Sequence, residues 1–254
     1  MKKTSTIDVA PTRCFGPAAR ILLSATVAAV SALACSNQGN RPLHAMRADG
    51  DVRYDVGDFA GAADHYQQYI DVKPSDPEIR YKLGRSYLEM GMYREARQNL
   101  QVAYDMSPDD ERYIDSLAES LLNAGENEYL YAFLTKVVNE RGRAADYLRL
   151  GEYGLKIGNP DDAVAALFTA AKLDGGFNAR YQVALARFYA DVGDRVNEVQ
   201  RLRMAYSLSP NNAYVLRRAA ELGEIVGPTW ALTPTERGLG RSPTDTGAPA
   251  GTAR

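Results

Sequence analysis

The sequence has few of the residues that most often carry catalysis or bind metals. It has two cysteines, Cys14 and Cys35, and two histidines, His44 and His65, among 254 residues. Both cysteines come before residue 43, where the repetitive part of the chain begins, so that part has no disulfide framework, thiolate metal site or catalytic thiol. Neither histidine lies in a hydrolase or metalloprotease motif. These absences predict that the protein is not an enzyme and has no metal site and no cofactor.

An excess of one charge and clusters of glycine are also lacking. The formal net charge is −2, so no basic excess indicates binding to nucleic acid or to an anionic membrane surface. Glycines recur singly at intervals of about 34 residues, which disfavours a phosphate-binding loop. The acidic pairs Asp109-Asp110 and Asp161-Asp162 lie at helix starts, where capping and the helix dipole account for them. No motif favours a small-molecule substrate, so recognition by a protein surface is the expected function.

A repeat is what the sequence does contain. Six glycines, separated by 33 to 35 residues, mark the predicted turns within repeats: Gly57, Gly91, Gly125, Gly158, Gly193 and Gly227. Five further residues mark the turns between repeats: Pro74, Pro108, Gly142, Gly175 and Pro210. Asp76, Asp110, Asn178 and Asn212 each precede a predicted helix, as N-cap residues do. The spacing predicts a series of helix–turn–helix units of about 34 residues.

The clearest unit is 77–110. Its apolar and small residues fall at fixed offsets along two helices: Leu83, Gly84, Tyr87, Tyr93, Ala96, Leu100 and Ala103. This pattern resembles the tetratricopeptide repeat, with Arg80 where the family usually has tryptophan. The resemblance implies an all-α, right-handed solenoid of about five repeats, at 43–76, 77–110, 111–143, 144–178 and 179–212. A helix at 213–226 is expected to cap its last apolar face.

Two places depart from the regular repeat pattern. Leu130 stands where the third repeat should have a small residue, so its two helices are expected to be pushed apart. The nearby Tyr129, Tyr131 and Phe133 either fill that wider gap or form an exposed docking patch. Residues 227–254 are rich in Thr, Pro, Gly and Ala and are expected to be a disordered tail, in which Trp230 either folds back on the capping helix or forms a short binding motif.

The N-terminus has the pattern of a targeting segment. Basic residues precede an apolar run, 21–34, which is shorter than the roughly 20 residues that a membrane-spanning helix needs. Residues 1–34 resemble a bacterial lipoprotein signal peptide that ends in Leu33-Ala34-Cys35. The resemblance implies lipidation of Cys35, sorting to the outer membrane because Ser36 follows, and a tether at 35–42. A plain cleaved signal or a short uncleaved anchor, with Cys35 incidental, remains the alternative.

The family resemblance also implies a binding surface. In tetratricopeptide proteins the first helices of successive repeats line a concave groove. Carried over by position, the groove residues are Tyr81, Arg85, Leu88, Asp115, Glu119, Leu122, Leu148, Glu152, Leu155, Val183 and Arg187. The Lys/Asn clamp of chaperone-binding members is not at the matching positions. The mixture of apolar and alternately charged residues favours a helix or an extended segment of another protein as the partner.

Together these patterns favour a non-catalytic, protein-binding scaffold anchored in the bacterial cell envelope as an outer-membrane lipoprotein facing the periplasm. In size and build it resembles type IV pilotins, the tight-adherence pilus lipoprotein, the repeat lipoprotein of the β-barrel assembly machine and adaptors of peptidoglycan hydrolases. Assistance in pilus or secretion complex assembly is therefore the expected role. The alternative is a soluble periplasmic or cytosolic adaptor or regulatory subunit.

Overall fold

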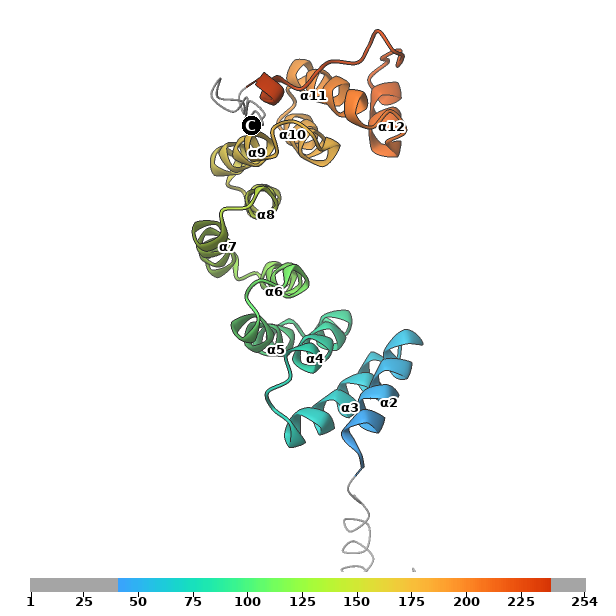
Figure 1. The fold of residues 1–254 in the computed structure, drawn as a ribbon, viewed down its shortest axis with the longest axis vertical. Helices are drawn as coiled ribbons and strands as arrows, with labels where there is room; N and C mark the ends of the chain where they lie inside the picture. Colours follow the sequence, from blue (N-terminus) through green and yellow to red (C-terminus); the bar gives the residue numbers. More distant parts are fainter. Residues whose placement is uncertain (1–40, 239–254) are drawn as a thin grey trace, which may run out of the picture.

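The computed structural model describes residues 41–238, which form a curved stack of helical hairpins (Figure 1). The first helices of the hairpins are α2 (Leu43–Asp55), α4 (Pro77–Glu89), α6 (Glu111–Asn123), α8 (Ala144–Lys156) and α10 (Ala179–Asp191). The second helices are α3 (Phe59–Val72), α5 (Tyr93–Met106), α7 (Asn127–Arg141), α9 (Pro160–Asp174) and α11 (Arg195–Leu208). The final helix, α12 (Ala213–Glu221), precedes a 3₁₀ turn, η1 (Thr235–Gly238).

The predicted signal peptide and Cys35 lie outside the described residues, as do residues 239–254. Between residues 41 and 238 the structure contains eleven α-helices and no strand, which confirms the predicted all-α solenoid. None of the helices in this range combines the length and the apolar character that crossing a membrane requires.

Local sequence signals set the helix ends. Asp76, Asp110, Asn178 and Asn212 each accept a hydrogen bond from a backbone N–H in the first turn of the helix that follows. The turn glycines from Gly57 to Gly193 all have positive φ, as predicted for residues that reverse the chain. The prediction for Gly227 was wrong, because α12 ends at Glu221 and Gly223 makes the turn instead, with φ of 75°.

Small residues allow the helices of a hairpin to cross closely. A Cβ atom added at Gly84 would lie 2.6 Å from Cγ of Leu100, and one added at Gly151 would lie 2.6 Å from Cγ of Leu167. Leu100, Leu167 and Ala96 are all buried at these crossings. The same positions of successive repeats therefore build one continuous core along the stack, and the close crossings predicted for the reference unit are confirmed.

The third repeat is looser, as Leu130 predicted. Leu130 is fully buried, and α6 and α7 pack less closely than the two helices of any other hairpin. Phe133 is buried and packs edge-on against Tyr104 of α5. Tyr129 and Tyr131 also link this repeat to its neighbours, since Arg97 lies over the ring of Tyr129 and the hydroxyl of Tyr131 donates to Asp162. The three aromatics thus contact neighbouring repeats, and whether they fill the gap between α6 and α7 stays a prediction.

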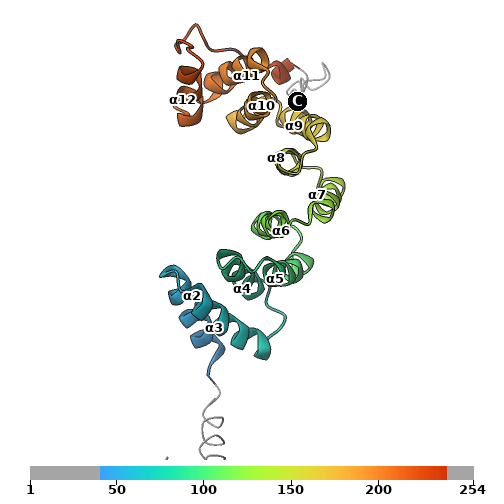
Figure 2. The ribbon, with the colours of Figure 1, turned by 180° about the vertical axis from the view of Figure 1, so that it is seen from behind.

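The segment after α12 differs from the predicted disorder as far as residue 238. Trp230 is only 8% exposed, and it packs against buried residues of α11 and α12 while its indole N–H donates to Glu224. This confirms the alternative in which Trp230 folds back. Figures 1 and 2 show the chain then returning across the top of the stack to η1, where Arg237 donates to the carbonyl of Gly176. Composition did not predict this ordered segment, because the segment is held by two buried side chains, the indole ring of Trp230 and the carboxylate of Glu236.

Candidate functional site

The first helices of the hairpins form the concave face of the solenoid. Figures 1 and 2 show α4, α6, α8 and α10 along the inside of the curve, with α5, α7 and α9 along the outside. Because every first helix has the same position in its repeat, residues about 34 apart in sequence become neighbours across this face. The charge of the concave face therefore depends on which side chains of one repeat contact those of the next.

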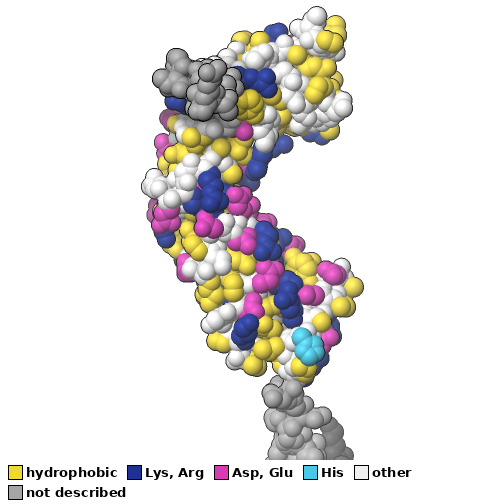
Figure 3. Space-filling view, viewed as in Figure 1, with side chains coloured by type: hydrophobic (Ala, Val, Ile, Leu, Met, Phe, Trp, Pro, Cys, Tyr) yellow, Lys and Arg dark blue, Asp and Glu magenta, His cyan; other side chains and the backbone are white. Residues whose placement is uncertain are grey.

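Over the first four repeats, charged side chains on this face pair with one another. We call four such pairs the charge ladder: Asp51–Lys82, Glu78–Arg112, Arg85–Glu119 and Asp115–Arg149. The Lys82–Asp51 and Arg85–Glu119 contacts measure 2.6 and 2.8 Å. Three of the four pairs join residues 34 apart, which is one repeat. Figure 3 shows basic and acidic side chains alternating over this part of the molecule.

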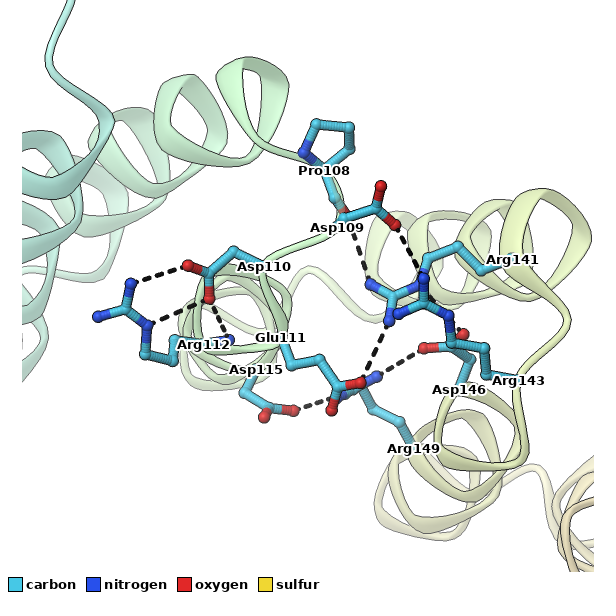
Figure 4. Close-up of polar contacts among 10 residues, drawn as sticks. All are labelled: Pro108, Asp109, Asp110, Glu111, Arg112, Asp115, Arg141, Arg143, Asp146 and Arg149. Carbon is cyan, nitrogen blue, oxygen red and sulfur yellow. Dashed lines mark hydrogen bonds and ion pairs between the residues drawn. The ribbon is translucent and has the colours of Figure 1, made fainter. Parts of the chain in front are cut away.

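The ladder ends in a buried cluster between the third and fourth repeats, shown in Figure 4. The side chain of Arg149 is 6% exposed and contacts Asp146, Asp115 and Glu111, while that of Asp146 is 0% exposed. Arg141 reaches the same Asp146 from the end of α7 and also contacts Glu111. Burial opposes the charge of Arg149, but the hydrogen bond to Asp115 and the nearby carboxylates outweigh it and raise the pKa of the guanidinium.

A first pocket, of about 610 Å³, lies at the N-terminal end of the concave face. Its lining consists of Asp51, Tyr54, Asp55, Tyr66, Tyr81, Lys82 and Arg85. Most of its polar groups already have partners within the chain. Asp51 accepts hydrogen bonds from both Lys82 and Tyr66, and these contacts outweigh its partial burial and lower the pKa of its carboxyl group. Tyr81 packs against Tyr113, and Arg112 covers it.

A second pocket, of about 780 Å³, lies between α8, α10, the turn before α10 and the turn before α12. A smaller one, of about 300 Å³, adjoins it and shares Glu152, Ala184 and Arg187. We call the two together the C-terminal groove. Its lining includes Glu152, Leu155, Lys156, Phe177, Arg180, Val183, Ala184, Arg187 and Asp191. Glu152 and Arg187 hold the same repeat position as Arg85 and Glu119, yet among residues 41–238 they form no ion pair with each other.

Comparison with known proteins agrees with this geometry. Residues 53–128 match the model of the tetratricopeptide repeat family. Among solved structures, a MamA protein is 20% identical and covers 73% of this chain and 98% of its own, with a TM-score of 0.52. TTC0263, a thermophilic tetratricopeptide protein of Thermus thermophilus, is 21% identical, with 71% and 98% covered and a TM-score of 0.51. The fold is a tetratricopeptide repeat solenoid.

A third solved structure, residues 41 to the end of MamA from Desulfovibrio magneticus RS-1, aligns with a TM-score of 0.53 at 17% identity. It covers 67% of this tetratricopeptide solenoid's chain and 97% of its own. A search of curated proteins gives no significant match to the sequence. At these identities the likeness concerns the fold alone.

The tetratricopeptide solenoid places the predicted groove residues in three environments. Tyr81, Arg85, Glu152, Leu155, Val183 and Arg187 line pockets. Asp115 and Glu119 belong to the charge ladder, and Leu122 packs half-buried against the core. Leu88, Leu148 and Val183 are buried in the core, which corrects their assignment to the groove. In the fourth repeat Arg149, the residue after Leu148, makes the contact with Asp115.

Other residues of the tetratricopeptide solenoid's concave face escaped prediction. Lys82 and Arg149 have a sequence signal, because each has an opposite charge about one repeat away, at Asp51 and Asp115. Phe177 has none, since it lies in a turn between repeats rather than on a first helix. Among the residues that the structure describes, no group of three or more His, Cys, Asp or Glu side chains is arranged to hold a metal ion.

Proposed function

We propose that the protein is a non-catalytic scaffold that binds a segment of another protein along its concave face. One observation carries the proposal: the C-terminal groove combines the apolar side chains of Leu155 and Phe177 with the charged Glu152 and Arg187 in two adjoining open pockets. Apolar contact area beside a few directional polar groups is the arrangement that peptide-binding grooves use. The match of residues 53–128 to a repeat family, rather than to an enzyme family, supports the same function.

We also propose that the scaffold is held at a bacterial membrane through a lipid on Cys35. The support comes from the sequence: an apolar run of signal-peptide length ends in Leu33-Ala34-Cys35, and α2 begins at Leu43. Eight residues from Cys35 to Pro42 span at most about 28 Å when extended, so the first repeat would stay close to the membrane surface. The outer membrane, facing the periplasm, is the proposed location, and assistance in pilus or secretion complex assembly is the proposed role.

Metabolic labelling tests the anchor. A host expressing the full chain is grown with labelled palmitate, and the wild type is compared with Cys35→Ala. We expect label and membrane association in the wild type and loss of both in the variant. If the two proteins carry equal label, or none, the lipid anchor is wrong and a soluble periplasmic or cytosolic adaptor takes its place.

Site-specific crosslinking tests the groove. A photoreactive amino acid replaces Leu155 in the groove or, as the control, the exposed Arg94 of the outer helix α5. In intact cells we expect a discrete crosslinked protein from position 155 and none from position 94. Mass spectrometry of the product then reports whether it is a pilus or secretion component. Equal crosslinking at both positions would argue against the concave face as the binding surface.

A further inference from the structure

We infer that the C-terminal groove takes an acidic segment of the partner protein, with carboxylates bound by Arg180 and Arg187 and apolar side chains between them. This inference rests on the proposed function and names the chemistry of its partner. Three observations support it: the arginines of the groove lack the ion-pair partners that the other inward-facing arginines have, the sequence explains this for Arg180, and Phe177 and Leu155 add apolar surface beside them.

Arginines of the charge ladder are neutralised within the chain. Arg85, Arg112 and Arg149 each contact at least two carboxylates. Arg180 and Arg187 also line the concave face, yet neither forms an ion pair among residues 41–238. Arg187 lies over the ring of Tyr214, with 4.7 Å from its guanidinium carbon to the ring centroid. Such stacking leaves the edge of a guanidinium available to donate hydrogen bonds.

The repeat register shows which residues lie opposite Arg180 and Arg187 in the neighbouring repeats. The residue one repeat after Glu78 is Arg112, but the residue one repeat after Arg180 is Tyr214. On the other side, the register places Ala145 opposite Arg180, so neither neighbour is acidic. For Arg187, the following repeat offers Glu221, which already pairs with Arg218 at 3.0 Å. In the preceding repeat the matching residue is Glu152, which forms no ion pair with Arg187 among residues 41–238. The sequence therefore explains the missing partner of Arg180, whereas that of Arg187 is seen only in the structure.

The remaining charges of the groove do not replace these partners. Asp174 lines the larger pocket, but its carboxylate accepts backbone hydrogen bonds from Phe177 and Asn178 at 2.8 and 2.7 Å. Glu152 stands beside Arg187 in both pockets and Asp191 in the smaller one, but among residues 41–238 neither carboxylate forms an ion pair with it. A ligand carboxylate in place of the missing partners would form charge-assisted hydrogen bonds, for which the planar guanidinium is well suited.

Apolar side chains accompany the two arginines. Val183 and Ala184 lie between them on α10 and are largely buried, while the half-buried Leu155 of α8 lines the smaller pocket together with Arg187. Phe177 is 73% exposed and also lines the larger pocket. A segment in which acidic residues alternate with apolar ones matches both features. A purely acidic segment would leave this apolar surface uncovered.

The chain's own C-terminal residues are a poor match for the site. Residues 239–254 lie outside the described residues and follow Gly238 at the end of η1. Their charged side chains are Arg241 and Arg254 and a single acidic residue, Asp245, so these side chains have no acidic excess. Charge complementarity therefore favours a partner protein as the occupant.

Selection from a random peptide library tests the inference. Displayed dodecapeptides are selected on the purified full chain and, in parallel, on a variant with both Arg180→Gln and Arg187→Gln. We expect the wild type to enrich peptides that combine Asp or Glu with apolar residues, and the variant to enrich none of them. Failure to enrich any peptide would count against the proposed function. Enrichment of peptides without acidic residues, or equally on both proteins, would leave the scaffold function standing and overturn this inference.

Affinities of the selected peptide then locate the contact. We expect Arg187→Gln to weaken binding about 10-fold or more, because a hydrogen-bonded charge pair is lost. Glu152→Gln should leave binding unchanged or strengthen it, since it removes a negative charge from the same pocket, and Arg94→Gln on α5 is the neutral control. A synthetic analogue with Lys at the acidic positions should bind an Arg187→Glu variant better than the wild type. Circular dichroism checks that each variant is folded.

Two results would contradict the assignment. Equal weakening by Arg187→Gln and Glu152→Gln would indicate a general structural effect rather than recognition of a carboxylate. A clear gain in affinity on Asp245→Asn would place the chain's own C-terminal residues in the groove and overturn the choice of a partner protein.

Discussion

The N-terminal and C-terminal halves of the concave face use the same repeat positions in different ways. In the second and third repeats, position nine holds Arg85 and Glu119, which pair at 2.8 Å. In the fourth and fifth repeats it holds Glu152 and Arg187, which line a pocket. The first arrangement joins neighbouring repeats, whereas the second leaves charged groups facing an open depression. The residue types at a position therefore do not decide whether it stabilises or binds, because the spacing between repeats also matters.

A second difference concerns burial. Arg149 and Asp146 are withdrawn from solvent at the end of the charge ladder, so their charges must be balanced within the chain. Arg187 is exposed and needs no such balance. Substitutions that are chemically identical should thus have different effects in the two halves, and four measurements can break or sharpen that comparison.

The largest effect is expected from Arg149→Met. The change removes one partner of the fully buried Asp146 and leaves only Arg141 to neutralise it, which should cost about 3–5 kcal/mol in the free energy of unfolding. Arg187→Met is the matched control and should change stability by no more than about 0.5 kcal/mol. Urea unfolding of both variants provides the test. Similar losses in the two would refute the distinction between a structural and a binding half.

Trp230→Ala should cost about 3 kcal/mol, confined to the C-terminal half. The indole ring fills the space between α11 and α12, and its removal leaves a cavity beside Leu202 and Val215. Hydrogen exchange should speed up in these two helices while α4 and α5 stay protected. Faster exchange throughout the molecule would mean that the repeats unfold as a single unit.

Ala96→Leu should cost about 1–3 kcal/mol through overpacking in the N-terminal half. The backbone of Ala96 already lies against Gly84 at the crossing of α4 and α5. Ala132→Leu, on the exposed side of α7, is the control and should be neutral within about 0.5 kcal/mol. An unchanged melting temperature for Ala96→Leu would contradict the register of the repeats.

The smallest effect is expected from pH. Hydrogen bonds from Lys82 and Tyr66 lower the pKa of Asp51, and bonds from Tyr69 and Lys73 lower that of Asp76. A depressed pKa means that each carboxylate stabilises the folded state above its unfolded pKa of about 4, and that this contribution is lost as the pH falls through the folded value. Asp51→Asn should flatten the acid limb of a melting-temperature profile. An acid limb identical to that of the wild type would show that this rung of the ladder adds no stability.

The periodic signals of the sequence were sufficient to predict most of the fold. Leu83, Gly84 and Ala96 recur at fixed offsets because two helices must cross closely, and such local requirements appear directly in the residue types. Leu130 likewise predicted the looser third repeat. The failures at Gly227 and at residues 228–238 have another cause. There a few long-range contacts, from Trp230 and Glu236, order a segment whose composition has no helical or strand period.

The concave face was less predictable than the fold. Position in the repeat placed Glu152 and Arg187 on this face, yet it also assigned Leu148 there, which is fully buried. Phe177 could not be found in this way, since it belongs to a turn and reaches the groove only through the folded arrangement of α8 and α10. Whether two charged residues form an ion pair also depends on their distance in the folded structure. Arg85 and Arg187 are both arginines on first helices, but among residues 41–238 only Arg85 lies within ion-pair distance of a carboxylate.

The chain segment after α12 returns over α10 and α11, and this arrangement also affects how two copies of the protein could pack end to end. A stack of identical repeats ends in an exposed apolar face. Such a face can pack against the first hairpin of another copy, much as the open edge of a sheet pairs with another strand. Here the ring of Trp230 covers that face, and the buried contact between Arg201 and Glu236 fastens the cover in place. We therefore expect end-to-end stacking of copies to be disfavoured at this end of the solenoid.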